Sequence, residues 1–428
     1  MLKGDYTIMQ IDSFDFESAI ANNEVIQTAR ERALAVLQPT DAELAHGLEL
    51  HAQSIVVDQF GFLPNVWTKA LVAEMIALHD AEIGARYYHY LSIDMRARAP
   101  MFDRDGALEF LAAVKASGVD CIVQTAAEGK TREIDLKRMS VFHGICQAFD
   151  SHMFMAGWAD HAQRAHEEGR TGVLFSVNGP PCPWAMHDGE EELGWLQTWR
   201  ELGVRLMHLT YNRRNGVGSG CMEDTDGGVS VFGRELIARM NEVGIVVDTA
   251  HSGPQTTLDA ARLSERPMMA SHAGCRALRD HPRMKYDEAI EAIAETGGTI
   301  GMCVIPGFLG LSGDLNALLD HIDHAVGLVG PEHVAIGTDI CYVPPWPEGL
   351  SGFPDARWSS QWWGAWKPEY ASPPSDEARL GSLSWTNWPM FTVGLVSRGY
   401  SDDDIRKIIG ENTLRVLRAN EPEAMVRV

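Results

Sequence analysis

Short apolar runs rich in β-branched residues alternate along the chain with longer amphipathic stretches of helix-forming residues. Eight such runs follow an N-terminal segment, up to about His51, that is itself rich in helix formers. This alternation predicts parallel strands joined by helices, and runs that are apolar throughout are typical of strands covered on both faces. We expect the strands at Ile55–Asp58, Val119–Gln124, Val173–Val177, Arg205–Leu209, Ile245–Asp248, Met268–Ala270, Thr299–Val304 and Val334–Gly337.

The number of strand and helix units favours one architecture. Eight units suit a closed α/β barrel, (β/α)8, of the TIM type, and a doubly wound open sheet is the alternative. Ser401 and Asp404 open a last helix with the pattern of a capping box. Glycine, the residue preferred just after a helix, directly follows three further expected helices, Ala107–Ser117, Val231–Val243 and Tyr286–Thr296.

One long segment interrupts the alternation. Between about residues 342 and 389 it is rich in prolines and tryptophans, including Pro344, Pro345, Trp346, Trp358, Trp362, Trp363, Trp366, Trp385 and Trp388. Because this segment follows the eighth strand, we expect a long ordered loop over the barrel mouth, serving as a lid or as an aromatic plug or subunit interface. The 428 residues then form one barrel domain with this insertion and a helical leader over about 1–51.

Charge and cysteine content narrow the class of protein. The formal net charge is -23 at pH 7 and no Lys/Arg-rich stretch offsets it, so we expect neither nucleic acid nor an anionic membrane as a partner. The seven cysteines lie far apart without a CxxC pair, which predicts buried thiols in a reducing cytosol. The N-terminus shows no apolar signal-peptide core, and no run is long enough to span a bilayer. We therefore expect a soluble, cytoplasmic protein.

Two histidines directly follow neighbouring expected strands. His251 ends the segment Ile-Val-Val-Asp-Thr-Ala-His, and His272 ends Met-Met-Ala-Ser-His. Because barrel enzymes carry their reacting groups at the C-terminal ends of strands, we expect both imidazoles above one opening. Asp339 follows the eighth strand, where a carboxylate could accept a proton or bind an ammonium group. For His251, His272 and Asp339, a structural role is the alternative. Asp58 is expected to be a buried carboxylate that caps loop amides.

Several segments together resemble one enzyme family. V-D-T-A-H, A-S-H, H-P-R, I-G-T-D and the closing G-Y-S-D-D-D-I-R-K-I-I-G-E-N-T-L-R-V are similar, over about Ile55–Arg418, to the renal or membrane dipeptidases. These are binuclear zinc peptidases with the amidohydrolase type of TIM barrel. The segment Leu209–Cys221 resembles bacterial members in which a tyrosine, here Tyr211, replaces the histidine after the fourth strand. The resemblance implies this fold, a cytoplasmic bacterial setting and a homodimer.

The resemblance also implies roles for single residues. His251 and His272 match the ligands of one zinc ion, and Asp339 matches the aspartate that manages the proton when a zinc-held hydroxide attacks the peptide. Arg283, just after His281-Pro282, matches the arginine that binds the substrate carboxylate. A guanidinium group suits a carboxylate because it can donate two parallel hydrogen bonds. A surface arginine in a turn is the alternative.

Three positions depart from the family. Phe60 and Phe62 stand where the family has the H-x-D pair that holds the other zinc ion, and Asn178 stands where it has a bridging glutamate. A phenyl ring cannot ligate zinc, and a neutral amide is a poor bridge between two cations. The departures imply one zinc ion at most, or none, and leave these three side chains to line the substrate site.

Three functions are compatible with these residues. The first is a hydrolase that cleaves an amide bond of a small carboxylate-bearing substrate, using water activated by one metal ion whose ligands include water and Asp339 or Asn178. The second is a metal-independent lyase, isomerase or epimerase in which Tyr211, Asp339 and the two histidines move protons. The third is an inactive homologue that binds a small molecule or a partner. Two imidazoles fall short of the three protein ligands usual for catalytic zinc, so the sequence leaves all three open.

Overall fold

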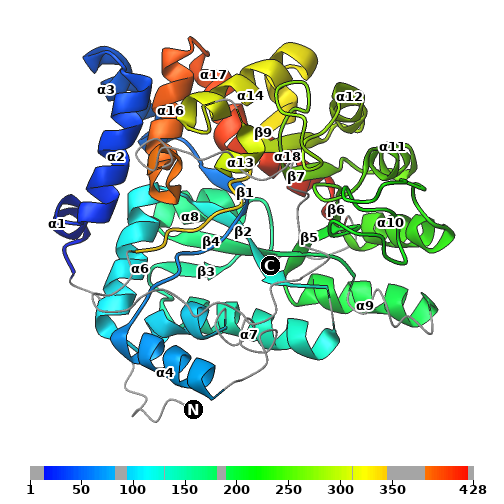
Figure 1. Ribbon diagram of the computed structural model, residues 1–428, viewed down its shortest axis with the longest axis horizontal. Coiled ribbons are helices and arrows are strands. Elements are labelled where there is room, and N and C mark those ends of the chain that lie inside the picture. The colour runs from blue at the N-terminus through cyan, green and yellow to red at the C-terminus, as the bar shows by residue number, and fades with distance from the viewer. Residues whose placement is uncertain are drawn as a thin grey trace.

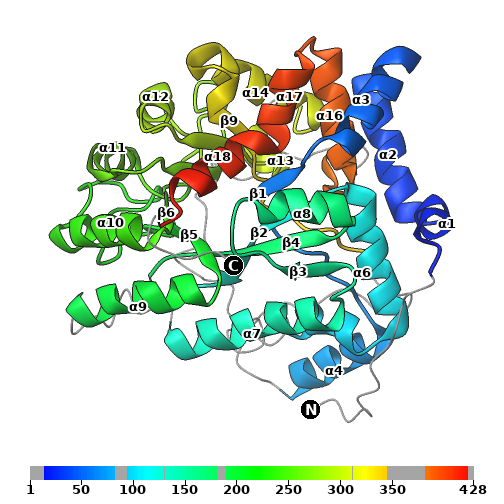
Figure 2. The ribbon, with the colours of Figure 1, turned by 180° about the vertical axis from the view of Figure 1, so that it is seen from behind.

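The computed structural model describes residues 14–81, 94–129, 131–180, 189–310, 312–344 and 381–422. Parallel strands lie at the centre and helices surround them in both ribbon views (Figures 1 and 2). Hydrogen bonds connect the strands in sequence order, which is the order of a barrel and not of a doubly wound sheet. The barrel strands are β1 (Val57–Gly61), β2 (Cys121–Ala127), β4 (Thr171–Val177), β5 (Val204–His208), β6 (Val246–Asp248), β7 (Met269–Ala273), β8 (Thr299–Met302) and β9 (Val334–Ile336).

The first and last barrel strands meet at the mouth. Beyond β9, the backbone N–H of Asp339 donates to the carbonyl oxygen of Phe60 (3.0 Å), and the N–H of Phe62 donates to that of Ile340 (3.2 Å). Gly337, just after β9, lets the backbone pass close to β7, because a Cβ at this position would lie 2.0 Å from the carbonyl oxygen of Ser271. All eight predicted strands are present, and the (β/α)8 barrel is confirmed.

A ninth strand, β3 (Met153–Met155), lies outside the predicted set. It pairs with the first residues of β4, and β5 pairs with the later residues of β4 from Phe175 onward. Because β2 pairs along the other edge of β4, β3 and β5 share one edge in succession. Three residues are too few to show a periodic pattern, so β3 has no signal in the sequence.

Helices form the outer layer, and their buried side chains, such as Phe110 and Trp199, build the main core against the strands. α6 and α10 end before glycines in the left-handed conformation, Gly118 (φ +65°) and Gly244 (φ +81°), as predicted. α12 ends at Glu295, one residue earlier than predicted. This layer contains α4 (Lys69–Asp80), α6 (Arg104–Ser117), α7 (Arg132–Ala148), α8 (His161–Glu168), α9 (Gly189–Glu201), α10 (Val231–Val243), α11 (Pro254–Leu263), α12 (Asp287–Glu295), α13 (Pro306–Leu309) and α14 (Leu315–Val329).

The leader packs against a late segment of the chain. α16 (Trp388–Ser397) lies beside α2 and α3 in both views (Figures 1 and 2). Trp385 and Trp388 are completely buried, so the prediction of a loop reaching Pro389 is wrong here: Trp388 begins a helix and belongs to the core. The other tryptophans of the predicted lid lie outside the described residues. The leader consists of α1 (Phe16–Ala21), α2 (Glu24–Leu37) and α3 (Asp41–Gln53).

The last helical segment covers the end of the barrel opposite the mouth. Ser401 caps it by accepting a hydrogen bond from the N–H of Asp404 (3.2 Å), as predicted. Gly410 packs closely against the segment that leads into β1. A Cβ on Gly410 would lie 2.0 Å from the carbonyl oxygen of Ile55. The segment consists of α17 (Asp402–Arg406), a π-helical turn (Lys407–Glu411) and α18 (Asn412–Ala419).

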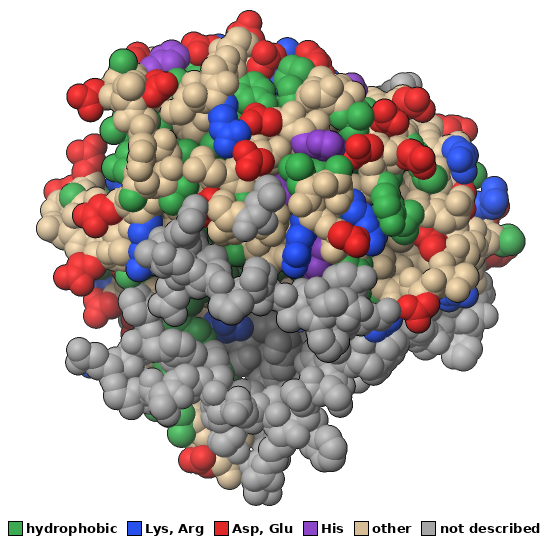
Figure 3. Space-filling model, turned by 45° about the horizontal axis from the view of Figure 1, so that its top comes forward, with side chains coloured by type: hydrophobic (Ala, Val, Ile, Leu, Met, Phe, Trp, Pro, Cys, Tyr) green, Lys and Arg blue, Asp and Glu red, His purple; other side chains and the backbone are tan. Residues whose placement is uncertain are grey.

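The surface agrees with the composition. On the face in Figure 3, acidic side chains are spread over the described surface and Lys and Arg are scattered among them. Within the described ranges, no helix combines the length and the apolar character needed to cross a membrane. The described cysteines are all free thiols, most of them buried, as predicted.

Candidate metal centre

Three buried histidines meet at the mouth of the barrel. His208 is the last residue of β5, His251 lies just beyond β6, and His272 lies in β7. The Nε2 atoms of His251 and His272 are 3.0 Å apart. One ring nitrogen of each histidine lies within 4.8 Å of those of the other two. The structure therefore brings the two predicted histidines together and adds a third.

The partners of the outer ring nitrogens indicate where the protons are. His251 Nδ1 is 2.7 Å from the side-chain oxygen of Asn212, which can only accept. His272 Nδ1 is 2.8 Å from Ser271 Oγ, whose own proton goes to the carboxylate of Asp248. Both Nδ1 atoms thus donate, and each neutral ring keeps a lone pair on Nε2. Lone pairs that face each other across 3.0 Å repel, and a cation bound to both removes the repulsion.

Neither ring readily takes up a second proton. Burial, followed by the charge of Arg283, holds the pKa of His251 and of His272 well below the usual range. A proton shared between the two Nε2 atoms is disfavoured at neutral pH for this reason. The neutral imidazole that results is the form that binds a metal ion.

His208 lies beside a carboxylate. Its Nε2 lies 2.7 Å from Oδ2 of Asp248 in an ion-pair contact, and neither ring nitrogen makes a well-aligned hydrogen bond within the described chain. Burial opposes ionisation of Asp248, but His208 and Ser271 outweigh burial, so the pKa of this carboxyl lies below its ordinary value. The ionised carboxylate orients His208 and, through Ser271, also His272. Carboxylates orient metal-binding histidines in this way.

Aromatic rings cover both histidines of the close pair. Phe60 stacks on His272 with ring centroids 3.7 Å apart and 16° between the planes. Tyr211 stacks on His251 at 4.0 Å and 21°. Phe62 packs edge-on against Phe60, with centroids 5.9 Å apart. The side of His272 that faces β1 thus meets a carbon ring in place of a ligand atom.

Asp339 stands at the edge of the cluster, with Oδ2 3.9 Å from Nε2 of His272. Its φ of +58° is left-handed, as is that of Asn212 at +59°; Asp and Asn tolerate this conformation, and strained backbone is often found at functional sites. Burial raises the pKa of Asp339 to about 7, and Arg283 acts in the opposite direction. A carboxyl group with this pKa can both accept and release a proton near neutral pH.

A hydrogen-bond network at Asp58 positions Asp339. The Asp58 carboxylate accepts from the N–H of Phe60 (3.3 Å) and of Thr338 (3.0 Å), from the Thr338 hydroxyl (2.6 Å) and from the indole N–H of Trp385 (3.0 Å). The prediction of a buried carboxylate that caps loop amides is confirmed. Because Thr338 precedes Asp339, these bonds hold the strained residue in place.

Two buried cations hold the loop that carries His251. Arg283 donates to the carbonyl oxygens of Ala250 and His272, the latter at 2.9 Å. Lys285 donates to two further carbonyl oxygens of the same loop, at 2.5 and 2.9 Å. Arg283 is 1% exposed, which excludes the surface arginine considered above. Its Nε makes no hydrogen bond within the described residues.

Asn178 follows β4 at the same end of the barrel and is almost buried. Its side-chain oxygen makes no hydrogen bond within the part of the chain that the structure describes. His208, Asp248 and Ser271 were not predicted as site residues, because they lie within strands and the predicted site residues lie just beyond the expected strands. A histidine and an aspartate inside otherwise apolar runs are the signal that could have found them.

Comparison with known proteins assigns the chain to a family. The family model of the membrane dipeptidases, peptidase family M19, matches residues 104–358, which is more than half of the chain. The chain belongs to the membrane dipeptidase family. The resemblance inferred from the sequence is thereby confirmed.

Individual members of the membrane dipeptidase family and related structures are only moderately similar. Dipeptidase verJ of Clonostachys rogersoniana is 23% identical over 302 residues, which cover 70% of this chain and 68% of that protein. An uncharacterized dipeptidase of Schizosaccharomyces pombe is 28% identical over 232 residues, covering 51% of this chain and 54% of that protein. An amidohydrolase structure from Pseudomonas aeruginosa superimposes with a TM-score of 0.64 at 25% identity, covering 88% of this chain and 99% of that one.

Proposed function

We propose that this chain is a metal-dependent hydrolase that cleaves an amide bond of a small, dipeptide-like substrate. The proposal places one divalent ion, zinc, on His251, His272 and His208. It is carried by the two Nε2 lone pairs that face each other 3.0 Å apart. Three imidazoles meet the number of protein ligands that a catalytic zinc ion usually has, and membership of the dipeptidase family supports the reaction class.

The surroundings support one ion and not two. Phe60 covers His272 and is itself covered by Phe62, so carbon atoms occupy the positions of the H-x-D ligands. Asn178 offers one neutral oxygen where a glutamate would bridge two ions. A second divalent ion would therefore lack both the charge and the number of ligands that it needs.

The residues around the cluster supply the proton transfers. When bound, a divalent ion acts as a Lewis acid that polarises a carbonyl and makes water more acidic. Asp339 accepts the proton of the attacking water and returns it to the leaving amine. Burial, with the carboxylates of Asp339 and Glu128, raises the pKa of Tyr211. Its phenol thus stays protonated and donates to the developing oxyanion.

Positive charge beside the cluster favours an anionic substrate group. Arg283 and Lys285 are buried next to the histidines, and both contribute to lowering the pKa of His251 and His272. Their charges attract a carboxylate into this low-dielectric mouth. The Nε–H of Arg283 makes no hydrogen bond within the described residues and can donate to this carboxylate, whereas each Nη atom already binds a backbone carbonyl. A dipeptide-like substrate with a free carboxylate fits this charge.

Metal analysis combined with a peptidase assay tests the proposal. Protein purified without added metal should contain about one zinc ion per chain, and a chelator should abolish dipeptide hydrolysis, which zinc should restore. His251→Ala and His208→Ala should each lower zinc content and turnover together. His46→Ala is the matched control, because His46 is an exposed histidine paired with Asp402, and it should change neither.

The same experiment separates the alternatives. Turnover that persists in metal-free protein would favour the lyase, isomerase or epimerase. Zinc binding without turnover of any dipeptide would leave the ligand-binding homologue. A His208→Ala variant with full zinc affinity would remove His208 from the ligand set.

A further inference from the structure

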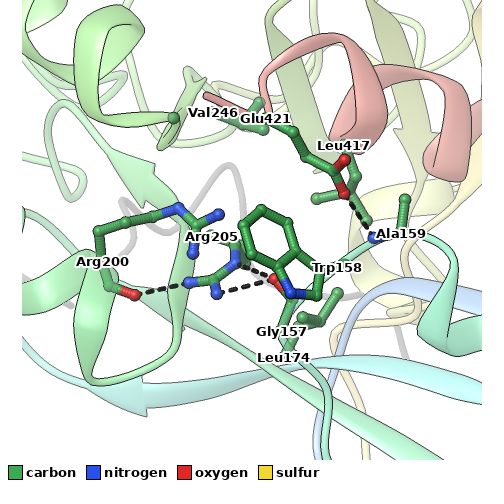
Figure 4. A pocket seen from close by; sticks show the side chains of 10 residues that line it. Gly157, Trp158, Ala159, Leu174, Arg200, Arg205, Val246, Leu417 and Glu421 are labelled. Carbon is green, nitrogen blue, oxygen red and sulfur yellow. Dashed lines mark hydrogen bonds between the residues drawn. The ribbon is translucent and has the colours of Figure 1, made fainter. Parts of the chain in front are cut away.

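A pair of buried arginines lies at the end of the barrel opposite the histidines. Arg205 is the second residue of β5, whereas His208 is its last. Arg200 lies in the last turn of α9, just before β5. Figure 4 shows the two guanidinium groups next to each other beside the ring of Trp158, with Glu421 reaching in from the far side. This end of the barrel takes no part in the proposed chemistry.

Arg205 is held by backbone carbonyl groups. Its Nε and Nη2 donate to the carbonyl oxygen of Gly157 at 2.9 and 2.8 Å. Its Nη1 donates to the carbonyl oxygens of Arg200 (2.7 Å) and Val204 (2.8 Å). These acceptors are neutral, so they fix the position of the guanidinium group without balancing its charge.

Some N–H groups of Arg200 have no acceptor among the described residues. Arg200 is 2% exposed, and its Nε and Nη2 make no hydrogen bond within the described residues. Its guanidinium carbon lies 5.1 Å from the ring centre of Trp158. Burial lowers the pKa of Arg200 to about 10, so the group is still charged at neutral pH. A buried cation with free N–H groups is costly unless an anion accompanies it.

The charges around the pair do not cancel. Glu421 is the carboxylate that acts on both arginines, and its Oε1 also accepts from the backbone N–H of Ala159 (2.8 Å). Nearby Asp160 binds Arg418 at the surface (2.8 Å). Among the residues that the structure describes, two buried guanidinium groups and one carboxylate leave one positive charge in excess.

The space between these side chains is small. Arg200, Arg205, Trp158 and Glu421 line a cavity of about 10 Å³. This is on the order of the space that a single bound water needs. Phosphate, sulfate or a carboxylate would not fit, whereas a halide ion is only slightly larger than water.

We propose that this cavity binds one chloride ion, held by the free N–H groups of Arg200 beside the guanidinium of Arg205. The ion neutralises the excess charge and lets Arg200, Trp158 and Glu421 pack together. It thereby stabilises the junction between α9, β5 and the segment after α18. Because the site lies at the far end from the histidines, chloride affects stability and leaves turnover unchanged.

Thermal unfolding in matched salts tests the proposal. At constant ionic strength, replacing gluconate by chloride or bromide should raise the Tm progressively, by roughly 2 °C or more at saturation. Bromide should also give an anomalous diffraction peak between Arg200 and Arg205. A Tm that does not respond to halide, or a water molecule in the cavity of crystals grown in bromide, would overturn the proposal.

Two variants should shift the halide response in opposite directions. Arg200→Gln removes one charge and should abolish the response. Glu421→Gln removes the competing carboxylate but keeps an acceptor for the N–H of Ala159, so it should strengthen the Tm response to halide. This variant keeps the test decisive if Arg200→Gln does not fold. Arg239→Gln is the control, since Arg239 pairs with Glu242 at the surface, and should respond as the parent does. Glu421→Gln with an unchanged or weaker response would contradict the site.

Discussion

The ring of Phe60 lies flat on the imidazole of His272, with centroids 3.7 Å apart and 16° between the planes. In the family pattern, the position of Phe60 carries a metal ligand. Here the side chain contributes packing to His272 and offers no electron pair for an ion. On the proposed function, this departure from the family pattern lowers the number of ions that the site can hold and restrains His272.

The first prediction concerns this packing. Phe60 is 2% exposed, so Phe60→Ala should lower the free energy of unfolding by about 3–5 kcal/mol, because it leaves a cavity beside His272. Phe62→Ala should cost less, since Phe62 is only partly buried. Urea unfolding of the ion-free proteins measures both. A loss below about 1 kcal/mol for Phe60→Ala would contradict the packing role.

The second prediction concerns ion number. Phe60→His alone should leave the zinc content at about one per chain, because one added ligand cannot hold an ion. Combining Phe60→His, Phe62→Asp and Asn178→Glu restores the pair and the bridge, and should raise the content toward two. Elemental analysis of the single and triple variants measures this. A second ion in the parent protein would refute the explanation.

The third prediction concerns pH. Burial raises the folded-state pKa of Asp339 to about 7, above the unfolded value of about 3.9. Its contribution to stability is thus fully present below pH ~4 and is lost as the pH rises to about 7, by at most ~1.4 kcal/mol per pH unit. In ion-free protein, Asp339→Asn should flatten the fall in unfolding free energy between pH 5 and 7. If the unfolding free energy fell equally steeply with pH in variant and parent, Asp339 would be ionised throughout this pH range.

The fourth prediction concerns Arg283. Arg283→Met leaves the buried carbonyls of Ala250 and His272 without donors, which should cost about 2–4 kcal/mol of stability. It should also raise KM several-fold for a dipeptide but not for its C-terminal amide. Arg276→Met, on the same loop but paired with the exposed Asp280, is the control. Unchanged stability would mean that Arg283 does not support the loop that carries His251.

The barrel can be predicted because its determinants are local. β4 is buried at every position, so its run is apolar apart from Thr171 and Ser176, and glycines mark the ends of α6 and α10. β3 cannot be predicted in this way, because its three residues form a strand only where β5 leaves part of the β4 edge free. Trp388 was predicted wrongly for a different reason. A tryptophan among prolines is typical of a loop, but Trp388 begins a helix that packs against the leader, which is distant in the sequence.

Some residues of the candidate site can likewise be predicted from strand order, and others depend on tertiary contacts. His251 lies just beyond β6 and His272 lies near the end of the neighbouring strand β7, so parallel pairing alone brings them together. The direction of His208 depends on the pleat of β5, which its pairing with β4 and β6 sets. The bond between Asn212 and His251 depends on a loop with a left-handed residue. Strand order can be deduced from sequence, whereas these tertiary partners cannot.

Gly410 contacts Ile55, in the region just before β1. One of the last described segments to be translated therefore packs against the start of the first strand. Until α17 and the π-helical turn leave the ribosome, the base of the barrel lacks its cover. Ile405, Ile408 and Ile409, all completely buried in the finished fold, reach their places only at that stage. The base of the barrel is therefore covered only after α17 and the π-helical turn are synthesised, and a nascent chain that stops before α17 exposes an apolar base to chaperones and proteases.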